Sequence, residues 1–166
     1  MNNIIIRSLK KDEIHLLDDF LYEAIFLPEG SPTLPRSIIE IPEVKVYIEN
    51  FGSKVGDHCL VADMEGKVIG AVWIRILSGP IKGHGNIDEE TPEFSISLYK
   101  EFRSQGIGKR LMTEMITLLK EYGYKQASLS VQKDNYAVKL YTDLGFEIIQ
   151  EHQTDYVMKL TFPQSL

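Results

Sequence analysis

The stretch that decides the fold is EFSISLYKEFRSQGIGKRL, residues 93–111. Its first half alternates Phe94, Ile96 and Leu98 with two serines, which is the two-residue period of a strand. Its second half holds two glycines one residue apart and opens an amphipathic run over 107–122, typical of a helix. The first amides of a helix lack intrahelical partners, and glycines let an anion approach them closely. We therefore expect a phosphate site at this turn.

Two common phosphate motifs do not fit this turn. A dinucleotide fingerprint would need glycine at Leu111, and a P-loop would need glycine at Arg103 and serine or threonine at Arg110. A purely structural interpretation also exists, because glycine permits a tight strand-to-helix turn without any ligand. Arg103 and Lys109 favour the phosphate interpretation, since they bring two full positive charges to the turn.

The rest of the chain alternates between strand and helix patterns. Strands are expected at 4–9, 58–63, 68–77, 93–99, 126–132, 146–151 and 156–162. Helices are expected at 10–26, 43–52, 107–122 and 135–144, the last with Gly145 just past its end, and loops at 27–42 and 78–92. The Met64–Lys67 turn predicts a hairpin between the second and third strands. This order predicts an α/β (α+β) fold, a single domain over residues 1–166 with a mixed, largely antiparallel sheet flanked by helices.

Composition narrows the function classes. The content of 43% hydrophobic and 25% charged residues is that of a soluble globular protein. The net charge of −6 argues against nucleic acid as the main partner, and no run approaches the roughly 20 apolar residues of a membrane span. A single cysteine, Cys59, excludes an internal disulfide and is consistent with a cytoplasmic location. The four histidines are scattered, so no metal site is expected.

A second stretch indicates which ligand would carry the phosphate. Residues 135–146 read NYAVKLYTDLGF and lie about thirty residues downstream of RSQGIG at 103–108. The two stretches, in this order and with a helix and a strand between them, resemble the acyl-CoA-binding motifs of the GNAT acetyltransferase superfamily. The resemblance implies the GNAT-like acyl-CoA N-acyltransferase fold and acetyl-CoA as cofactor. The first 55 residues match only as a strand followed by two helices.

The resemblance also implies which residues bind the cofactor. Backbone groups of Ile96 and Leu98 would pair with the pantetheine arm, amides of residues 105–109 would hold the pyrophosphate, and Asn135 would bind the arm. The full implied set is Ile96, Ser97, Leu98, Arg103, Ser104, Gln105, Gly106, Ile107, Gly108, Lys109, Asn135 and Tyr141. From the residues alone, Asn135 is equally an N-cap of its helix.

Three residues carry the implied chemistry. The Leu98 amide would stabilise the oxyanion, Tyr141 would protonate the departing thiolate, and Glu93 would act as general base, directly or through water. Spacing alone also allows Tyr141 to be a core tyrosine. The acidic loop Asp88–Glu90 either binds a cationic acceptor or is merely solvated. His84, in the same loop, is a further candidate base or simply an exposed side chain.

We therefore expect an enzyme that moves an acetyl group from acetyl-CoA to a primary amine, on a small molecule or peptide, by direct transfer in a ternary complex. A homodimer is possible, because this superfamily often dimerises. A non-catalytic acyl-CoA sensor and a nucleotide-binding protein are the alternatives. The acceptor is expected between residues 24–43 and 78–93. Candidate residues for its cleft are Tyr22, Phe26, Glu29, Trp73 and Arg75.

Overall fold

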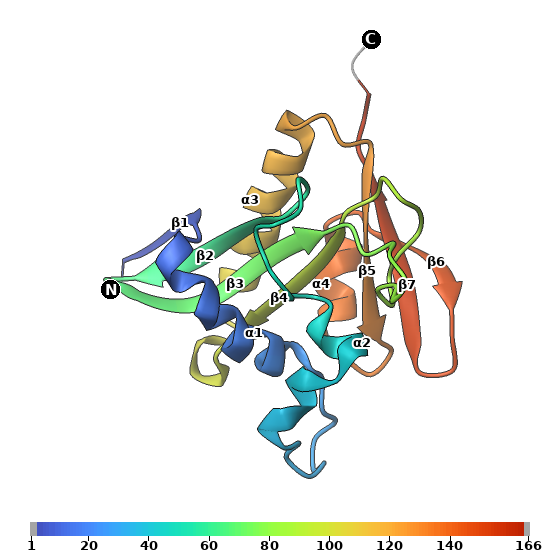
Figure 1. Cartoon of the computed structure of the whole chain (residues 1–166). Coiled ribbons are helices and arrows are strands. Elements are labelled where there is room, and N and C mark those ends of the chain that lie inside the picture. Colours follow the sequence, from blue (N-terminus) through green and yellow to red (C-terminus); the bar gives the residue numbers. More distant parts are fainter. Residues whose placement is uncertain (1–2, 165–166) are drawn as a thin grey trace.

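The computed structural model describes residues 3–164, and a seven-stranded sheet organises them (Figure 1). The strands, in their order across the sheet, are β1 (Ile4–Ser8), β2 (His58–Met64), β3 (Lys67–Arg75), β4 (Glu93–Leu98), β5 (Gln126–Gln132), β7 (Asp155–Thr161) and β6 (Glu147–Glu151). Every neighbouring pair is antiparallel except β4 and β5, which are parallel. The predicted mixed, largely antiparallel sheet is confirmed.

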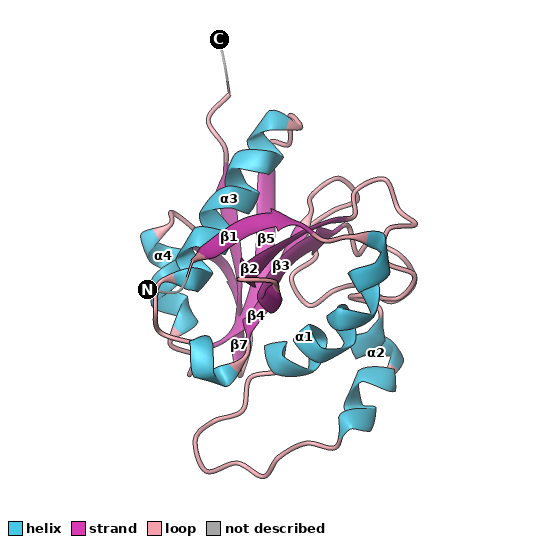
Figure 2. Ribbon diagram, turned by 90° about the vertical axis from the view of Figure 1, so that its left-hand side faces the viewer, coloured by secondary structure: helices cyan, strands magenta, loops and turns pink. Residues whose placement is uncertain are grey.

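Helices cover both faces of this sheet (Figure 2). One face carries α1 (Leu17–Ala24) and α2 (Pro42–Lys45), and the other carries α3 (Ile107–Glu121) and α4 (Ala137–Asp143). The alternation of β3 explains this, because Ala71 and Trp73 pack in the core beneath α1 while Val72 and Ile74 pack in the core beneath α3. Three short 3-10 helices cover Lys11–Leu16, Arg36–Glu40 and Lys100–Phe102. Within residues 3–164, no helix has the length and apolar character to cross a membrane.

Most predicted elements occur close to their expected bounds. The predicted hairpin is confirmed, and both Glu65 (φ 51°) and Gly66 (φ 96°) are left-handed, as a two-residue hairpin turn requires. The helix predicted over 43–52 was wrong in length, since α2 has only four residues. After α2 the chain runs in turns, and the Val46 and Glu49 carbonyls accept hydrogen bonds from the buried Arg75 side chain.

The sheet opens between β4 and β5. These strands share one ladder position, Glu93 opposite Ser128, and pair nowhere else. On its other side β4 pairs with β3, and the Tyr99 amide continues that ladder to the Ile69 carbonyl. Because hydrogen-bonded and non-bonded positions alternate in an antiparallel pair, Ile96 and Leu98 turn their amides and carbonyls away from β3, toward the opening. The splay thus leaves the Ile96 backbone groups and the Leu98 amide without a strand partner beside the starts of α3 and α4, while the Leu98 carbonyl accepts the Arg103 side chain.

Candidate active site

The turn before α3 has the geometry of an anion site. Ser104 (φ 62°) and Gly106 (φ 83°) are left-handed, and the first amide bonded within the helix is that of Arg110, 3.2 Å from the Gly106 carbonyl. The amides of residues 105–109 donate to no group in the described chain. A Cβ built on Gly108 would lie 3.9 Å from Leu98 and Leu140 side-chain atoms, so this turn faces β4 and α4 closely. Free amides at a helix start attract phosphate.

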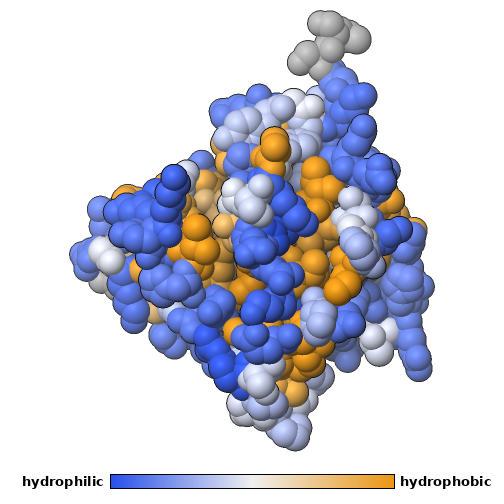
Figure 3. Space-filling model, in the orientation of Figure 1, coloured by the Kyte–Doolittle hydropathy of each residue, from blue (hydrophilic) through white to orange (hydrophobic). Residues whose placement is uncertain are grey.

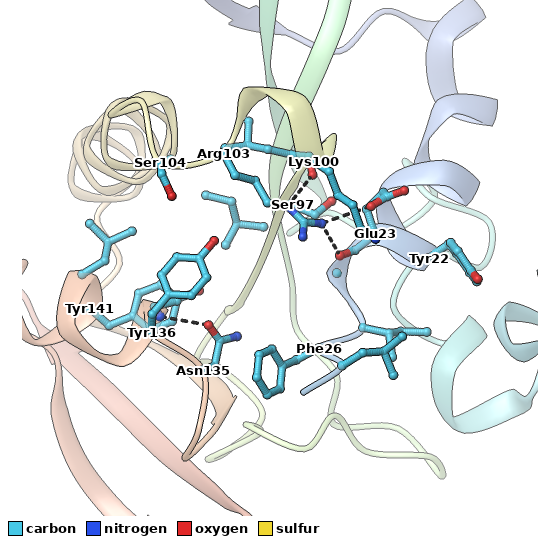
Figure 4. A pocket seen from close by; sticks show the side chains of 18 of the residues that line it. Tyr22, Glu23, Phe26, Ser97, Lys100, Arg103, Ser104, Asn135, Tyr136 and Tyr141 are labelled. Carbon is cyan, nitrogen blue, oxygen red and sulfur yellow. Dashed lines mark hydrogen bonds and ion pairs between the residues drawn. The ribbon is translucent and has the colours of Figure 1, made fainter. Parts of the chain in front are cut away.

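A cavity of about 510 Å³ runs from this turn along β4 to α4. Its volume is within the usual range for a ligand site. Lys100, Arg103 and Lys109 line it, against the single carboxylate of Glu23. Figure 4 shows Tyr136 on one side of this cavity and Arg103 with Glu23 on the other. Its excess of positive charge suits a phosphate-bearing ligand.

Two predicted cofactor residues have other partners. The Arg103 guanidinium donates to the Leu98 carbonyl (3.1 Å) and pairs with the Glu23 carboxylate (3.1 Å), so it braces β4 against α1 (Figure 4). The Ser97 hydroxyl donates to the Phe20 carbonyl (2.6 Å), because the strand alternation turns Ser97 toward α1. Both residues border the cavity, but neither aims a free polar side chain at the pyrophosphate turn.

Asn135 and Tyr141 approach the cavity from the α4 side. The Asn135 side-chain oxygen accepts the Ala137 amide (2.9 Å), as a cap does, which leaves its NH₂ group unbonded among the described residues (Figure 4). The Tyr141 ring packs edge-on against Phe146 and is 7% exposed. Burial raises the pKa of Tyr141, so its hydroxyl is protonated at neutral pH. That hydroxyl has no hydrogen-bond partner in the described chain and is placed to donate into the cavity.

A second cavity, of about 470 Å³, adjoins the first. The two share Ile96, Asn135 and Tyr141 in their walls. Figure 3 shows hydrophobic side chains gathered in the middle of one face of the molecule, among hydrophilic ones. Both cavities also share the apolar Phe26, so Phe26 is confirmed as a cleft residue, and Tyr22 lines the first cavity.

Glu93 lies in the wall of the second cavity and is only 2% exposed. One carboxylate oxygen accepts the Tyr47 hydroxyl (3.0 Å) and the Gly85 amide (3.1 Å), and the other, Oε1, has no partner. Burial raises the pKa of Glu93 to about 7, although the two hydrogen bonds act in the opposite direction. A carboxyl group with this pKa exchanges protons readily near neutral pH.

The loop GHG, residues 83–85, seals Glu93. A Cβ on Gly83 would lie 2.1 Å from Glu93 Oε1, and one on Gly85 would lie 2.7 Å from the backbone of Leu129, so neither position has room for a side chain. His84 lies on the exposed side of the loop and borders the second cavity, while its amide donates to the Tyr47 hydroxyl (2.8 Å). The paired glycines were the sequence signal for this close packing, but nothing in the sequence predicted that Tyr47 takes part in it.

Some residues predicted near the acceptor lie elsewhere. Trp73 and Arg75 are each 1% exposed in the core, so their placement in the cleft was wrong. Trp73 donates to the Tyr47 carbonyl (3.1 Å), and Arg75 forms a buried ion pair with Asp57 (2.9 and 2.8 Å). Both therefore hold the Tyr47 segment in place from below. Glu29 is exposed and borders neither cavity.

The acidic loop agrees with the second of its two interpretations, since residues 88–90 are exposed to solvent. Asp88 accepts the amides of Glu90 and Thr91, and the side chains of residues 88–90 point to solvent instead of lining either cavity. The carboxylates that do line the second cavity with Glu93 are Glu43 and Asp155. They lie far apart in the sequence, and no local motif marks either of them.

A splayed strand pair beside a helix start with free amides, joined to a second cavity with a buried carboxylate, is the arrangement expected of a group-transfer enzyme with a phosphate-bearing donor. Comparison with known proteins agrees. The acetyltransferase (GNAT) family matches residues 22–146, and the chain belongs to this family. It is therefore an N-acetyltransferase whose cofactor is acetyl-CoA, as the motif resemblance implied.

Individual relatives support this assignment. The L-amino acid N-acetyltransferase AaaT of Escherichia coli is 28% identical over 131 residues, which cover 76% of this chain and 77% of that protein. The PaiA N-acetyltransferase of Thermoplasma acidophilum, solved with coenzyme A, has a TM-score of 0.68 at 20% identity over 96% of this chain and 99% of its own. The putative acetyltransferase YncA of Salmonella typhimurium, solved with acetyl-CoA, has a TM-score of 0.69 at 17% identity over 99% and 96%.

Proposed function

We propose that residues 1–166 form one N-acetyltransferase domain that moves an acetyl group from acetyl-CoA directly to a primary amine in a ternary complex. The observation that carries this proposal is the junction of the two cavities at Ile96, Asn135 and Tyr141. Donor and acceptor can then occupy separate spaces and meet at one point. Cys59 supports direct transfer, because burial raises the pKa of its thiol and makes it a poor nucleophile for a covalent acyl-enzyme.

The residues at the junction fit coenzyme A. The free amides of 107–109 suit its pyrophosphate, and the Ile96 backbone groups and the Leu98 amide, which face away from β3, suit the amides of its pantetheine arm. The NH₂ group of Asn135 adds a donor across the opening. When bound there, coenzyme A presents its acetyl thioester beside Leu98.

Different groups of the chain then remove the proton from the amine, stabilise the oxyanion and protonate the sulfur. Glu93 accepts the proton from the acceptor amine, and its pKa of about 7 suits a base at neutral pH. Because Glu93 is buried behind the Tyr47 hydroxyl, we infer that this hydroxyl or a water carries the proton to it. The Leu98 amide stabilises the developing oxyanion, a role worth about 3–4 kcal/mol in other enzymes. Tyr141 donates a proton to the departing sulfur.

Initial-rate kinetics test this proposal. Thiol release from acetyl-CoA is measured over a grid of donor and amine concentrations. Intersecting double-reciprocal lines are expected for a ternary complex, whereas parallel lines would indicate a covalent acyl-enzyme and refute direct transfer. Cys59→Ala is the control and keeps full activity. Acetyl-CoA binding with no thiol release for any amine would favour a non-catalytic sensor. The cytoplasmic location and the homodimer stay predictions.

A further inference from the structure

The second cavity has an uncompensated negative charge. The carboxylates in its wall come from three elements: Glu43 from α2, Glu93 from β4 and Asp155 from β7. Among residues 3–164, no lysine or arginine lines it, whereas three line the cofactor cavity. From this we propose that the acceptor is a small aliphatic di- or polyamine, with at least one positive charge besides the reacting amine and no carboxylate next to it. This inference rests on the proposed function.

None of the three carboxylates has a cationic partner in the described chain. The nearest lysine in sequence to Glu43 is Lys45, which pairs with Glu40 instead (2.8 Å). Asp155 accepts only the Ser130 hydroxyl (3.2 Å) among side-chain donors. A bound cation would supply the counter-charge that these carboxylates lack among the described residues.

Two buried groups of the second cavity, Glu93 and Tyr47, show the same excess of negative charge. Glu93 Oε1 is enclosed and has no hydrogen-bond partner, although enclosed polar atoms are nearly always bonded. Burial raises the pKa of Tyr47, and the charges of Glu93 and Asp155 raise it further, so both carboxylates act on one hydroxyl inside the cavity. The three carboxylates do not form a cluster able to hold a metal ion within residues 3–164, which favours an organic cation.

The shape of the cavity suits a linear chain. Glu93 lies opposite Ser128 on β5, and Asp155 lies opposite Gln132 on the same strand. Four residues along a strand span roughly 13 Å, and the cavity wall follows β5 over most of that length. Phe26 and other apolar side chains line the space between the charges, as a methylene chain would require. An amino acid would instead bring its own carboxylate against these acids, with no lysine or arginine among the described lining residues to receive it.

Three matched acceptors separate the effect of a second amine from the effect of a carboxylate. 1,5-Diaminopentane, n-pentylamine and L-lysine share a five-carbon chain with a terminal primary amine, and differ by the second amine and by the carboxylate. We expect kcat/KM for the diamine to exceed that of each of the others at least about tenfold, the low end for a hydrogen bond to a charged group. Added NaCl should reduce this preference, because it screens the carboxylates.

Two variants test whether the preference for the diamine comes from Asp155 and Glu43. In Asp155→Asn and Glu43→Gln we expect the diamine-to-pentylamine ratio of kcat/KM to fall about fivefold or more, and further in the double variant. Glu49→Gln is the matched control, since Glu49 is an exposed acid just beyond α2 that does not line the cavity. Its ratio is expected to equal that of the wild type.

Failure of this inference is distinct from failure of the proposed function. Equal kcat/KM for all three amines, or a preference for L-lysine, would overturn the acceptor class while leaving N-acetyl transfer intact. If coenzyme A binds but no amine releases thiol, the proposed function fails, and calorimetry with coenzyme A present still decides the acceptor class. We then expect 1,5-diaminopentane to bind more tightly than n-pentylamine, and Asp155→Asn to remove the difference. Equal binding of both amines overturns the inference.

Discussion

The buried Glu93 carboxyl couples the stability of the fold to pH. Its pKa is raised in the folded protein from the usual 4.5 to about 7, mainly by burial, so the folded state holds this proton more tightly than the unfolded state. The stabilisation from the proton is therefore complete below pH 4.5 and is lost as the pH rises through about 7. Glu93→Gln removes the titration and keeps a similar shape.

The size of the effect follows from the shift. A difference of 2.5 between the pKa values of the folded and unfolded states, at about 1.4 kcal/mol for each unit, amounts to about 3 kcal/mol in full. Between pH 5 and pH 8 most of this is lost. We expect the free energy of unfolding of the wild type to fall by roughly 2–3 kcal/mol more than that of Glu93→Gln over this range.

Urea unfolding of both proteins at pH 5, 6, 7 and 8 measures this difference. All other titrating groups are common to the two proteins and cancel in the comparison. The glutamine oxygen retains the acceptor for Tyr47 and the Gly85 amide, so the variant is expected to fold. A difference between the two proteins that stays constant within about 0.5 kcal/mol from pH 5 to pH 8 would refute the raised pKa. It would also remove Glu93 as a base suited to neutral pH.

Other residues give independent tests. Gly108→Glu places a carboxylate at the free amides of α3 and should abolish acetyl-CoA binding in calorimetry. The control Gly79→Glu lies in an open loop and should bind acetyl-CoA normally. Unchanged affinity of Gly108→Glu would refute the pyrophosphate site. Tyr141→Phe should lower kcat about tenfold or more with little change in the Kd for acetyl-CoA, and equal turnover would exclude its hydroxyl as proton donor. Asp57→Ala leaves Arg75 buried without its carboxylate, so urea unfolding should show a loss of about 3–5 kcal/mol, and a loss below 1 kcal/mol contradicts this assignment.

Local patterns predicted the fold well because its elements are locally encoded. The alternation at Phe94, Ile96 and Leu98 and the glycine turn before α3 correspond to β4 and the helix start within a residue or so. Gly145, just past α4, has the left-handed φ of 103° that a helix end favours. Here the physical cause of each element lies within a few residues of it.

Sequence patterns point to parts of the candidate site that lie in one short stretch, but not to contacts between distant residues. The contact between Tyr47 and Glu93 joins residues 46 apart, and the pairing of Arg103 with Glu23 joins residues 80 apart. Neither contact leaves a periodic signal, because each depends on how α1 and the α2 segment dock on the sheet. The sequence did not predict which carboxylates meet in the second cavity for the same reason, since Asp155 lies on β7, two strands beyond β4 in the sheet.

The single ladder position between β4 and β5 makes this the place where the sheet is joined by the fewest strand-pairing bonds. At that position the Ser128 amide donates to the Pro92 carbonyl (3.0 Å), and the Ser128 hydroxyl adds a bond to the Gly85 carbonyl (2.6 Å). If coenzyme A lies between the strands, as proposed above, it gives the Ile96 and Leu98 amides acceptors. Their hydrogen exchange is then fast in the free protein and slow in the complex, which places local unfolding of the splay under ligand control.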